Sequence, residues 1–125
     1  MKIRIVDIEK NVIYAESEIG CFKGKWCSSK PIIFKKYFVE LDCVDVITPT
    51  SIELSLSCEA CIEQDSHTIK ITGIVEDIED NLIFLRVEED LLMLNISSRL
   101  DFEQYIGLYV RITVNTIEIY DIGIL

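Results

Sequence analysis

The sequence predicts an all-β protein with one short helix, built as two tandem barrel-like units packed into one compact domain. Three observations support this. Apolar and polar residues alternate with a period of two along most of the chain, as half-buried strands require. The string Asp-Ile-Glu-x-Asn occurs at 7–11 and again at 77–81, 70 residues later. Half of the 125 residues are hydrophobic, which is enough for a buried interior.

Two further matches follow the repeated string in the same order. Residues 38–41 match 109–112, and residues 52–54 match 117–119. Three collinear matches indicate an internal duplication. The predicted division is a first β unit over 1–60, a linker over 61–67 and a second β unit over 68–125. Because each unit is so small, we expect neither to fold without the other.

In the first unit, alternation predicts strands near the N-terminus, over 39–43 and over 52–58, with Cys58 facing inward. The repeated string marks a hairpin turn, since Asn and Asp tolerate the left-handed backbone of tight turns. Residues 20–31 show no clean period and are predicted to form a long loop.

The second unit shows its elements more clearly. A hairpin over 68–78 and 82–88 leads to a third strand over 91–96, and two strands over 108–115 and 116–122 end the chain. Between them, 98–106 has helical spacing, with Ser98 and Asp101 available as N-caps and Gly107 as a stop. This is the order of a small OB-type barrel, and an SH3-like barrel is also compatible. Element order alone does not assign a function.

The charge balance is acidic: 12 Lys+Arg against 22 Asp+Glu, a net charge of -10 and a pI near 4.5. Such a surface disfavours nucleic acid and anionic membranes and favours a basic protein partner. No signal peptide or transmembrane span is expected, because charged residues interrupt 1–8 and 106–125. Five cysteines without a secretion signal indicate reduced thiols in a cytoplasmic protein.

No motif predicts catalysis, a cofactor or a metal site. The chain has no glycine-rich phosphate loop and a single histidine, His67, which is interpreted as an exposed residue at a strand start. Cys58 and Cys61 form a C-x-x-C pair without a second pair, so whether they bind a metal stays open. Acidic clusters around 77–80 and 88–90 are interpreted as charged hairpin tips.

The leading hypothesis is therefore a non-enzymatic protein-binding module that presents acidic loops to a basic partner. One version is an immunity or inhibitor protein that neutralises a basic nuclease toxin, since carboxylates can fill a site built for phosphates. Exposed strand edges would also allow a homodimer. The predicted partner-binding residues are Glu59, Glu63, Asp65, Glu88, Glu89 and Asp90.

The alternative hypothesis is an OB-like barrel that binds single-stranded nucleic acid or an oligosaccharide through the 20–31 segment. Its ligand-binding residues would be Phe22, Lys23, Lys25 and Trp26. A competing interpretation of the same segment is a solvated loop with Trp26 folded back onto the core. A small enzyme is the least supported class, because one histidine and scattered carboxylates assemble no catalytic set.

Overall fold

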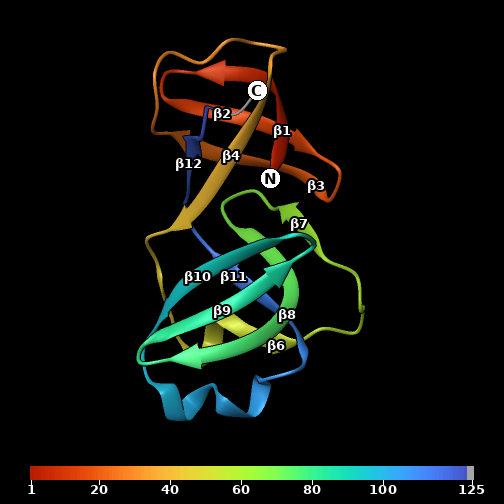
Figure 1. The fold of residues 1–125 in the computed structure, drawn as a ribbon, viewed down its shortest axis with the longest axis vertical. Helices are drawn as coiled ribbons and strands as arrows, with labels where there is room; N and C mark the ends of the chain where they lie inside the picture. The colour runs from red at the N-terminus through yellow and green to blue at the C-terminus, as the bar shows by residue number, and fades with distance from the viewer. Residues whose placement is uncertain (124–125) are drawn as a thin grey trace.

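The structure is a computed structural model that describes residues 1–123 and contains twelve strands and three 3-10 helices (Figure 1). The strands of the first half are β1 (Lys2–Glu9), β2 (Val12–Ser17), β3 (Gly20–Trp26), β4 (Lys36–Cys43), β5 (Val46–Ile47) and β6 (Ile52–Leu54). Those of the second half are β7 (Cys61–Gln64), β8 (Ile69–Glu79), β9 (Leu82–Val87), β10 (Asp90–Ile96), β11 (Tyr109–Val114) and β12 (Ile117–Asp121). The 3-10 helices are η1 (Pro49–Ser51), η2 (Arg99–Asp101) and η3 (Glu103–Tyr105). The predicted all-β class is confirmed.

The predicted short helix over 98–106 is a pair of 3-10 turns. The Ser98 side chain makes no capping hydrogen bond, and the Ser98 carbonyl instead accepts one from the Asp101 amide at 3.2 Å. Gly107 ends the segment with φ +84°, in the left-handed region that glycine tolerates. No helix of residues 1–123 has the length and hydrophobicity needed to cross a bilayer.

The upper unit in Figure 1 is a closed five-stranded barrel in the order β1-β2-β3-β12-β4, with β4 pairing back to β1. β12 runs parallel to β3 and antiparallel to β4, whereas the other neighbours are antiparallel. A closed barrel leaves no free strand edge. With β12 as the fifth strand, this is the strand order of an OB-type barrel.

The lower unit repeats this order. Its sheet runs β5-β10-β9-β8-β11-β6, with β7 as an extra strand on β8. β5 is parallel to β10 and β6 is antiparallel to β11. The two ends of the sheet, β5 and β6, are consecutive in the chain and joined only by η1, so the sheet curls back on itself. Together they take the place that β12 has in the upper barrel.

Each unit therefore receives its fifth strand from the other half of the chain. Figure 1 shows the blue β12 among the red and orange strands and the yellow β6 among the green and cyan ones. The predicted units 1–60 and 68–125 describe the sequence copies, whereas in space residues 46–54 complete the second sheet and 117–121 complete the first barrel. Residues 61–64 of the predicted linker form β7.

The repeated string forms equivalent hairpins in the two units. β9 and β10 begin and end 70 residues after β2 and β3. Lys10 and Asp80 occupy the same turn position with φ of 58° and 52°. Asp7 and Asp77 each follow a register shift in their strand, and each side chain accepts a hydrogen bond from the next backbone amide at 2.9 and 2.8 Å. The string thus has a structural role.

The prediction of a long loop over 20–31 is wrong for most of its length, because Gly20–Trp26 forms β3. Its alternation is complete once Gly24 is counted as an inward residue: Phe22, Gly24 and Trp26 are buried, and the lysines between them are exposed. A Cβ at position 24 would overlap the Ile119 side chain of β12. Glycine therefore stands there because the fifth strand packs against the β3 backbone.

The prediction that Cys58 faces inward on a strand over 52–58 is also wrong. β6 ends at Leu54, and the Ser55 amide still donates to the Tyr109 carbonyl of β11 at 3.0 Å. Residues 56–58 then leave the sheet through a turn in which the Ser55 hydroxyl donates to the Ser57 carbonyl at 2.8 Å. As a result Leu56 and Cys58 are exposed and do not face the core. Serine hydroxyls that bind the local backbone compete with strand pairing here.

The two units are joined by strand contacts as well as by the chain. The Ile62 amide of β7 donates to the Ile19 carbonyl at 2.8 Å, and the Lys23 amide of β3 donates to the Gln64 side chain at 2.8 Å. A single hydrophobic core extends through both units.

Candidate functional site

The outward faces of the two hairpins are the equivalent surfaces on which the copies can be compared. OB-type barrels commonly bind ligands on the face of their second and third strands. In the upper unit this is β2 and β3, and in the lower unit β9 and β10. We call them the first outer face and the second outer face, and their members are 70 residues apart in sequence.

The first outer face carries an aromatic residue and lysines. Tyr14 lies opposite Lys23 across the β2–β3 ladder, and Val12 lies opposite Lys25. Both lysines are exposed, and Tyr14 is half-buried. On the neighbouring strand, Asp7 pairs with Tyr14, so the face mixes positive and negative charge.

The second outer face has an apolar centre at the equivalent positions. Phe84 lies opposite Met93, and Leu82 lies opposite Asn95. Met93 is 55% exposed and the adjacent Leu91 is 42% exposed, so this surface is open to solvent. Where the first face has lysines, the second has Met93 and Asn95. The two copies have thus diverged in chemistry on the same surface.

Carboxylates surround the apolar centre of the second outer face. Asp77 pairs with Phe84 and Glu79 pairs with Leu82 on the adjacent strand β8, and the β9–β10 turn adds Glu88 and Glu89. No lysine interrupts residues 71–114. An apolar centre with a polar, solvent-accessible rim is the usual arrangement of a protein–protein interface.

Arg86 fixes one end of this rim. Its guanidinium binds Glu76 through two hydrogen bonds of 2.7 and 3.3 Å and donates to the Glu89 carbonyl at 3.1 Å. The hydrogen bond from Arg86 lowers the pKa of the Glu76 carboxyl, and the same bond raises the pKa of Arg86. The pair holds the β9–β10 turn in place while its acidic side chains remain in solvent.

The net charge is distributed unevenly over the chain. Residues 46–114, which form the second unit, contain 13 acidic and 4 basic residues. Each of those four basic side chains is engaged by a carboxylate: Lys70 with Asp65, Arg86 with Glu76, Arg99 with Glu103 and Arg111 with Glu53. The other eight basic residues all lie in 1–36, and within residues 1–123 none of their side chains forms an ion pair. The molecule is therefore electrically polar, with its excess negative charge in the second unit.

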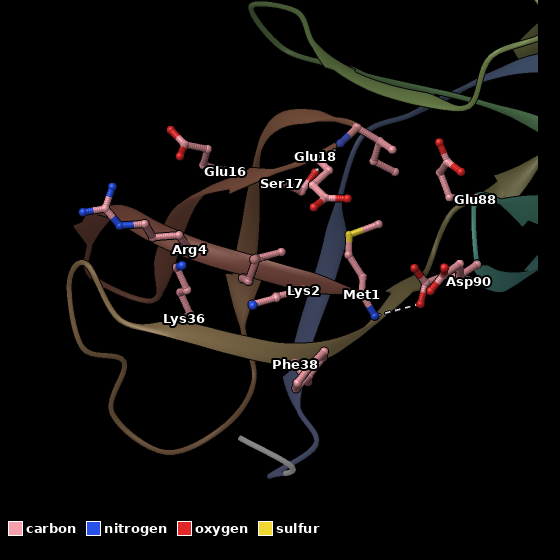
Figure 2. Close-up of a pocket in the computed structure, with 13 residues that line it drawn as sticks. Met1, Lys2, Arg4, Glu16, Ser17, Glu18, Lys36, Phe38, Glu88 and Asp90 are labelled. Atoms are coloured by element: carbon pink, nitrogen blue, oxygen red, sulfur yellow. Dashed lines mark hydrogen bonds and ion pairs between the residues drawn. The ribbon is translucent and has the colours of Figure 1, made fainter.

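A cleft lies where the two units meet. One part of about 610 Å³ is lined by Arg4 and Lys36 of the upper barrel and by Glu88 and Asp90 of the lower unit (Figure 2). A second part of about 460 Å³ is lined by Cys58, Glu59 and Tyr109, and both parts share Glu18, Ile19 and Glu88. The cleft is open and carries charges of both signs. The Met1 amine spans it to the Asp90 carboxylate at 2.7 Å.

Four of the six predicted partner-binding residues are brought together around this cleft. Glu88, Glu89 and Asp90 line its first part, and Glu59 together with Glu88 lines its second. Asp90 is already occupied by the Met1 amine. The structure thus places Glu88 and Glu89 between the cleft and the second outer face.

The other two predicted partner-binding residues lie at β7, away from that group. Asp65 forms an ion pair with Lys70 at 3.5 Å, and Glu63 lies opposite the same lysine in the β7–β8 ladder. Lys70 therefore partly compensates their charge. The sequence-based list of partner-binding residues omits Asp77 and Glu79, which lie at the second outer face, although their alternation with the buried Ile78 indicated that they point outward.

The four residues predicted to bind a ligand through the 20–31 segment are split by the β3 alternation. Phe22 and Trp26 point into the core, where Trp26 packs edge-on against Tyr37 with ring centroids 4.9 Å apart and its indole N–H donates to the Ser29 carbonyl. Lys23 and Lys25 point to solvent. The competing interpretation is confirmed in that Trp26 is buried, and wrong in that Trp26 ends a strand and not a solvated loop.

The thiols and the histidine assemble no metal centre in the described residues. No group of three or more His, Cys, Asp and Glu side chains in 1–123 is arranged to hold an ion. His67 is exposed in the bend between β7 and β8, as predicted. Burial, together with nearby Asp45 and Asp42, raises the pKa of the Cys43 thiol to about 12.

Comparisons of the chain with protein-family models, with curated proteins and with solved structures find no match.

Proposed function

We propose that the protein is a non-enzymatic binding module whose second outer face and adjoining acidic turns bind a basic protein partner. The observation that supports this most directly is the concentration of negative charge in residues 46–114, where every basic side chain is already paired with a carboxylate. A basic partner would be steered to this unit and held at its apolar centre by Phe84 and Met93.

An immunity or inhibitor protein for a basic nuclease is the concrete version that we favour. A nuclease site holds phosphates, and the rim carboxylates Asp77, Glu79 and Glu88 offer oxygens that can replace them. Five free thiols agree with a reducing cytoplasm, where such an inhibitor would act.

The test is binding and inhibition with a nuclease toxin encoded beside this gene. We expect a one-to-one complex by isothermal titration calorimetry, with affinity falling as salt rises. Met93→Lys should weaken it at least tenfold, because it places a cation, which repels a basic partner, in the apolar centre. The upper barrel carries a lysine at the equivalent position, so a lysine is compatible with this strand geometry.

The matched control is Lys23→Met, the reciprocal change on the first outer face. It should leave the complex unchanged. The proposal fails if no basic nuclease binds, or if the two variants weaken binding equally, since the second outer face would then have no special role.

A second candidate function rests on the first outer face. Tyr14 beside Lys23 and Lys25 offers one stacking ring and two cations, a composition that suits a short single-stranded nucleic acid or an oligosaccharide. This version no longer involves Phe22 and Trp26. Fluorescence anisotropy with labelled oligothymidine would test it. Lys25→Glu should abolish binding, and equal binding by that variant would exclude this face.

A further inference from the structure

The most exposed run of large apolar side chains in the described residues lies at one end of the molecule. Ile32 is 55% exposed, Ile33 45% and Phe34 60%. We call these three residues the 32–34 tip. It belongs to the connection from β3 to β4, which lies at the top of Figure 1, at the opposite end from η2 and η3.

The tip is held in place by backbone and side-chain hydrogen bonds. The Phe34 amide donates to the Ile5 carbonyl at 2.6 Å, and the Ile5 amide donates to the Lys35 carbonyl at 3.1 Å. The Lys35 amide closes the turn on the Ile32 carbonyl at 3.2 Å, and the Ile32 amide donates to the Tyr37 hydroxyl at 3.1 Å. The apolar side chains are thus presented outward by an ordered turn that is anchored to β1.

Phe34 has a backbone conformation that its side chain does not favour. Its φ is +65°, in the left-handed region where a bulky residue is uncommon. Arg4 supports it from below, with its guanidinium 5.2 Å from the ring centroid and its Nε 3.5 Å from the Phe34 carbonyl. An exposed phenylalanine held in a strained conformation does not serve packing, and such strain commonly marks functional positions.

Cations surround the tip on an otherwise acidic protein. Residues 19–39 contain no Asp or Glu, and they include Lys30, Lys35 and Lys36 next to the tip. Arg4 lies opposite Lys36 in the β1–β4 ladder, with Glu16 across β1 on the other side. Arg4 and Lys36 also line the cleft with Glu88, whereas Lys30 and Lys35 belong to the β3–β4 connection itself. The excess negative charge lies in the second unit, and exposed charges are screened over about 8 Å at physiological ionic strength, so the charge nearest the tip is positive.

We propose that the 32–34 tip inserts into the surface of an anionic lipid bilayer, with Lys30, Lys35, Lys36 and Arg4 contacting the lipid headgroups. A bilayer accepts protruding aliphatic side chains without a preformed pocket, and flanking lysines can reach the headgroups from their edge. Phe34 is the one ring of the tip, and the Arg4 guanidinium already lies 5.2 Å from its centroid, so the tip offers bases little to stack on, which disfavours nucleic acid at this surface. The net charge alone predicts no membrane contact, but the net charge does not describe this end of the molecule.

The test is co-sedimentation with vesicles of phosphatidylcholine containing 30% phosphatidylserine, against vesicles of phosphatidylcholine alone. We expect binding to the anionic vesicles only, decreasing as salt rises. The double variant Ile33→Ser/Phe34→Asn should lower the partition coefficient at least tenfold. Asparagine accepts the left-handed backbone at position 34, so this variant should keep its fold, which circular dichroism would verify.

Leu100→Ser is the matched control, because Leu100 is 79% exposed on η2 in the equivalent connection of the second unit. It should bind vesicles as the parent does. Absence of binding to anionic vesicles at low salt would overturn the proposal, as would equal loss in the control variant. Binding of the parent to polyglutamate but to neither vesicle would also overturn it and would assign the tip to an acidic protein. None of these outcomes depends on the nuclease experiment.

Discussion

At the scale of single residues, the five cysteines show how strongly environment determines chemistry. Cys21 and Cys58 are exposed, Cys27 and Cys61 are half-buried, and Cys43 is buried at the end of β4. The reactive form of a thiol is the thiolate, so a thiol that is buried and has a raised pKa, as Cys43 has, reacts least.

We therefore predict that Cys43 resists alkylation in the folded protein. At pH 8, iodoacetamide should modify Cys21 and Cys58 first, and Cys43 only after denaturation. Mass spectrometry of proteolytic fragments would measure the order. Modification of Cys43 at the rate of Cys58 in the native state would contradict the burial of this strand end.

The same thiol should make stability depend on pH in the alkaline range. Folding raises the pKa of the Cys43 thiol from its ordinary value of 9.0 to about 12. The unfolded chain therefore loses this proton near pH 9 while the folded chain keeps it. The contribution of this thiol to the free energy of unfolding is thus complete below pH 9 and is lost as pH rises toward 12. Urea unfolding between pH 8 and 11 should show this decline, and Cys43→Ala should reduce the slope relative to the parent.

At the scale of elements, the exchanged fifth strands connect the stability of the two units. Ile119 of β12 and Ile47 of β5 are buried, and each pairs in parallel with the third strand of a unit, next to Trp26 and Ile96. Ile119 comes from the second half of the chain but lies in the first barrel, and Ile47 comes from the first half but lies in the second unit. Removing either side chain should therefore weaken both units together.

We expect Ile119→Ala and Ile47→Ala each to destabilise the protein by about 3 kcal/mol, the usual cost of truncating a buried isoleucine. Both variants should still unfold in one cooperative transition, followed by Trp26 fluorescence and far-UV circular dichroism. Two separated transitions in either variant would show that the units unfold independently.

The sequence could predict the elements better than their partners. The hairpins at 7–14 and 77–84 depend on local turn chemistry and alternation, both of which are visible in the sequence. The destination of the fifth strands depends on long-range pairing, and the four residues 48–51 inserted between β5 and β6 hide the equivalence with β12. The β3 strand was missed because Gly24 interrupts its apolar pattern. The acidic turn at 88–90 could be predicted as exposed, but not its position at the cleft.

At the scale of the whole molecule, the two ends differ in chemistry. The excess negative charge lies in the second unit, whereas the 32–34 tip with its lysines lies at the far end of the first barrel (Figure 1). This separation is what the two proposals need: a surface for a basic protein in the second unit and a surface for anionic lipid at the other end. It requires that the two units keep a fixed relation, which the exchanged strands and the β3–β7 contacts provide.

Because the units exchange strands, we expect two fragments of the chain to fold only when both are present. A fragment of residues 1–60 would lack β12 and a fragment of residues 61–125 would lack β5 and β6, so each would leave an open third strand and an exposed core. We expect both fragments to be unstructured or aggregated alone and to recover native circular dichroism when mixed in equal amounts. Mixing with a 1–60 fragment carrying Ile47→Ala should recover less, because that strand must then complete a weakened sheet. A fragment that folds cooperatively alone would show that the exchange is not required, and that each copy can complete its barrel with its own fifth strand.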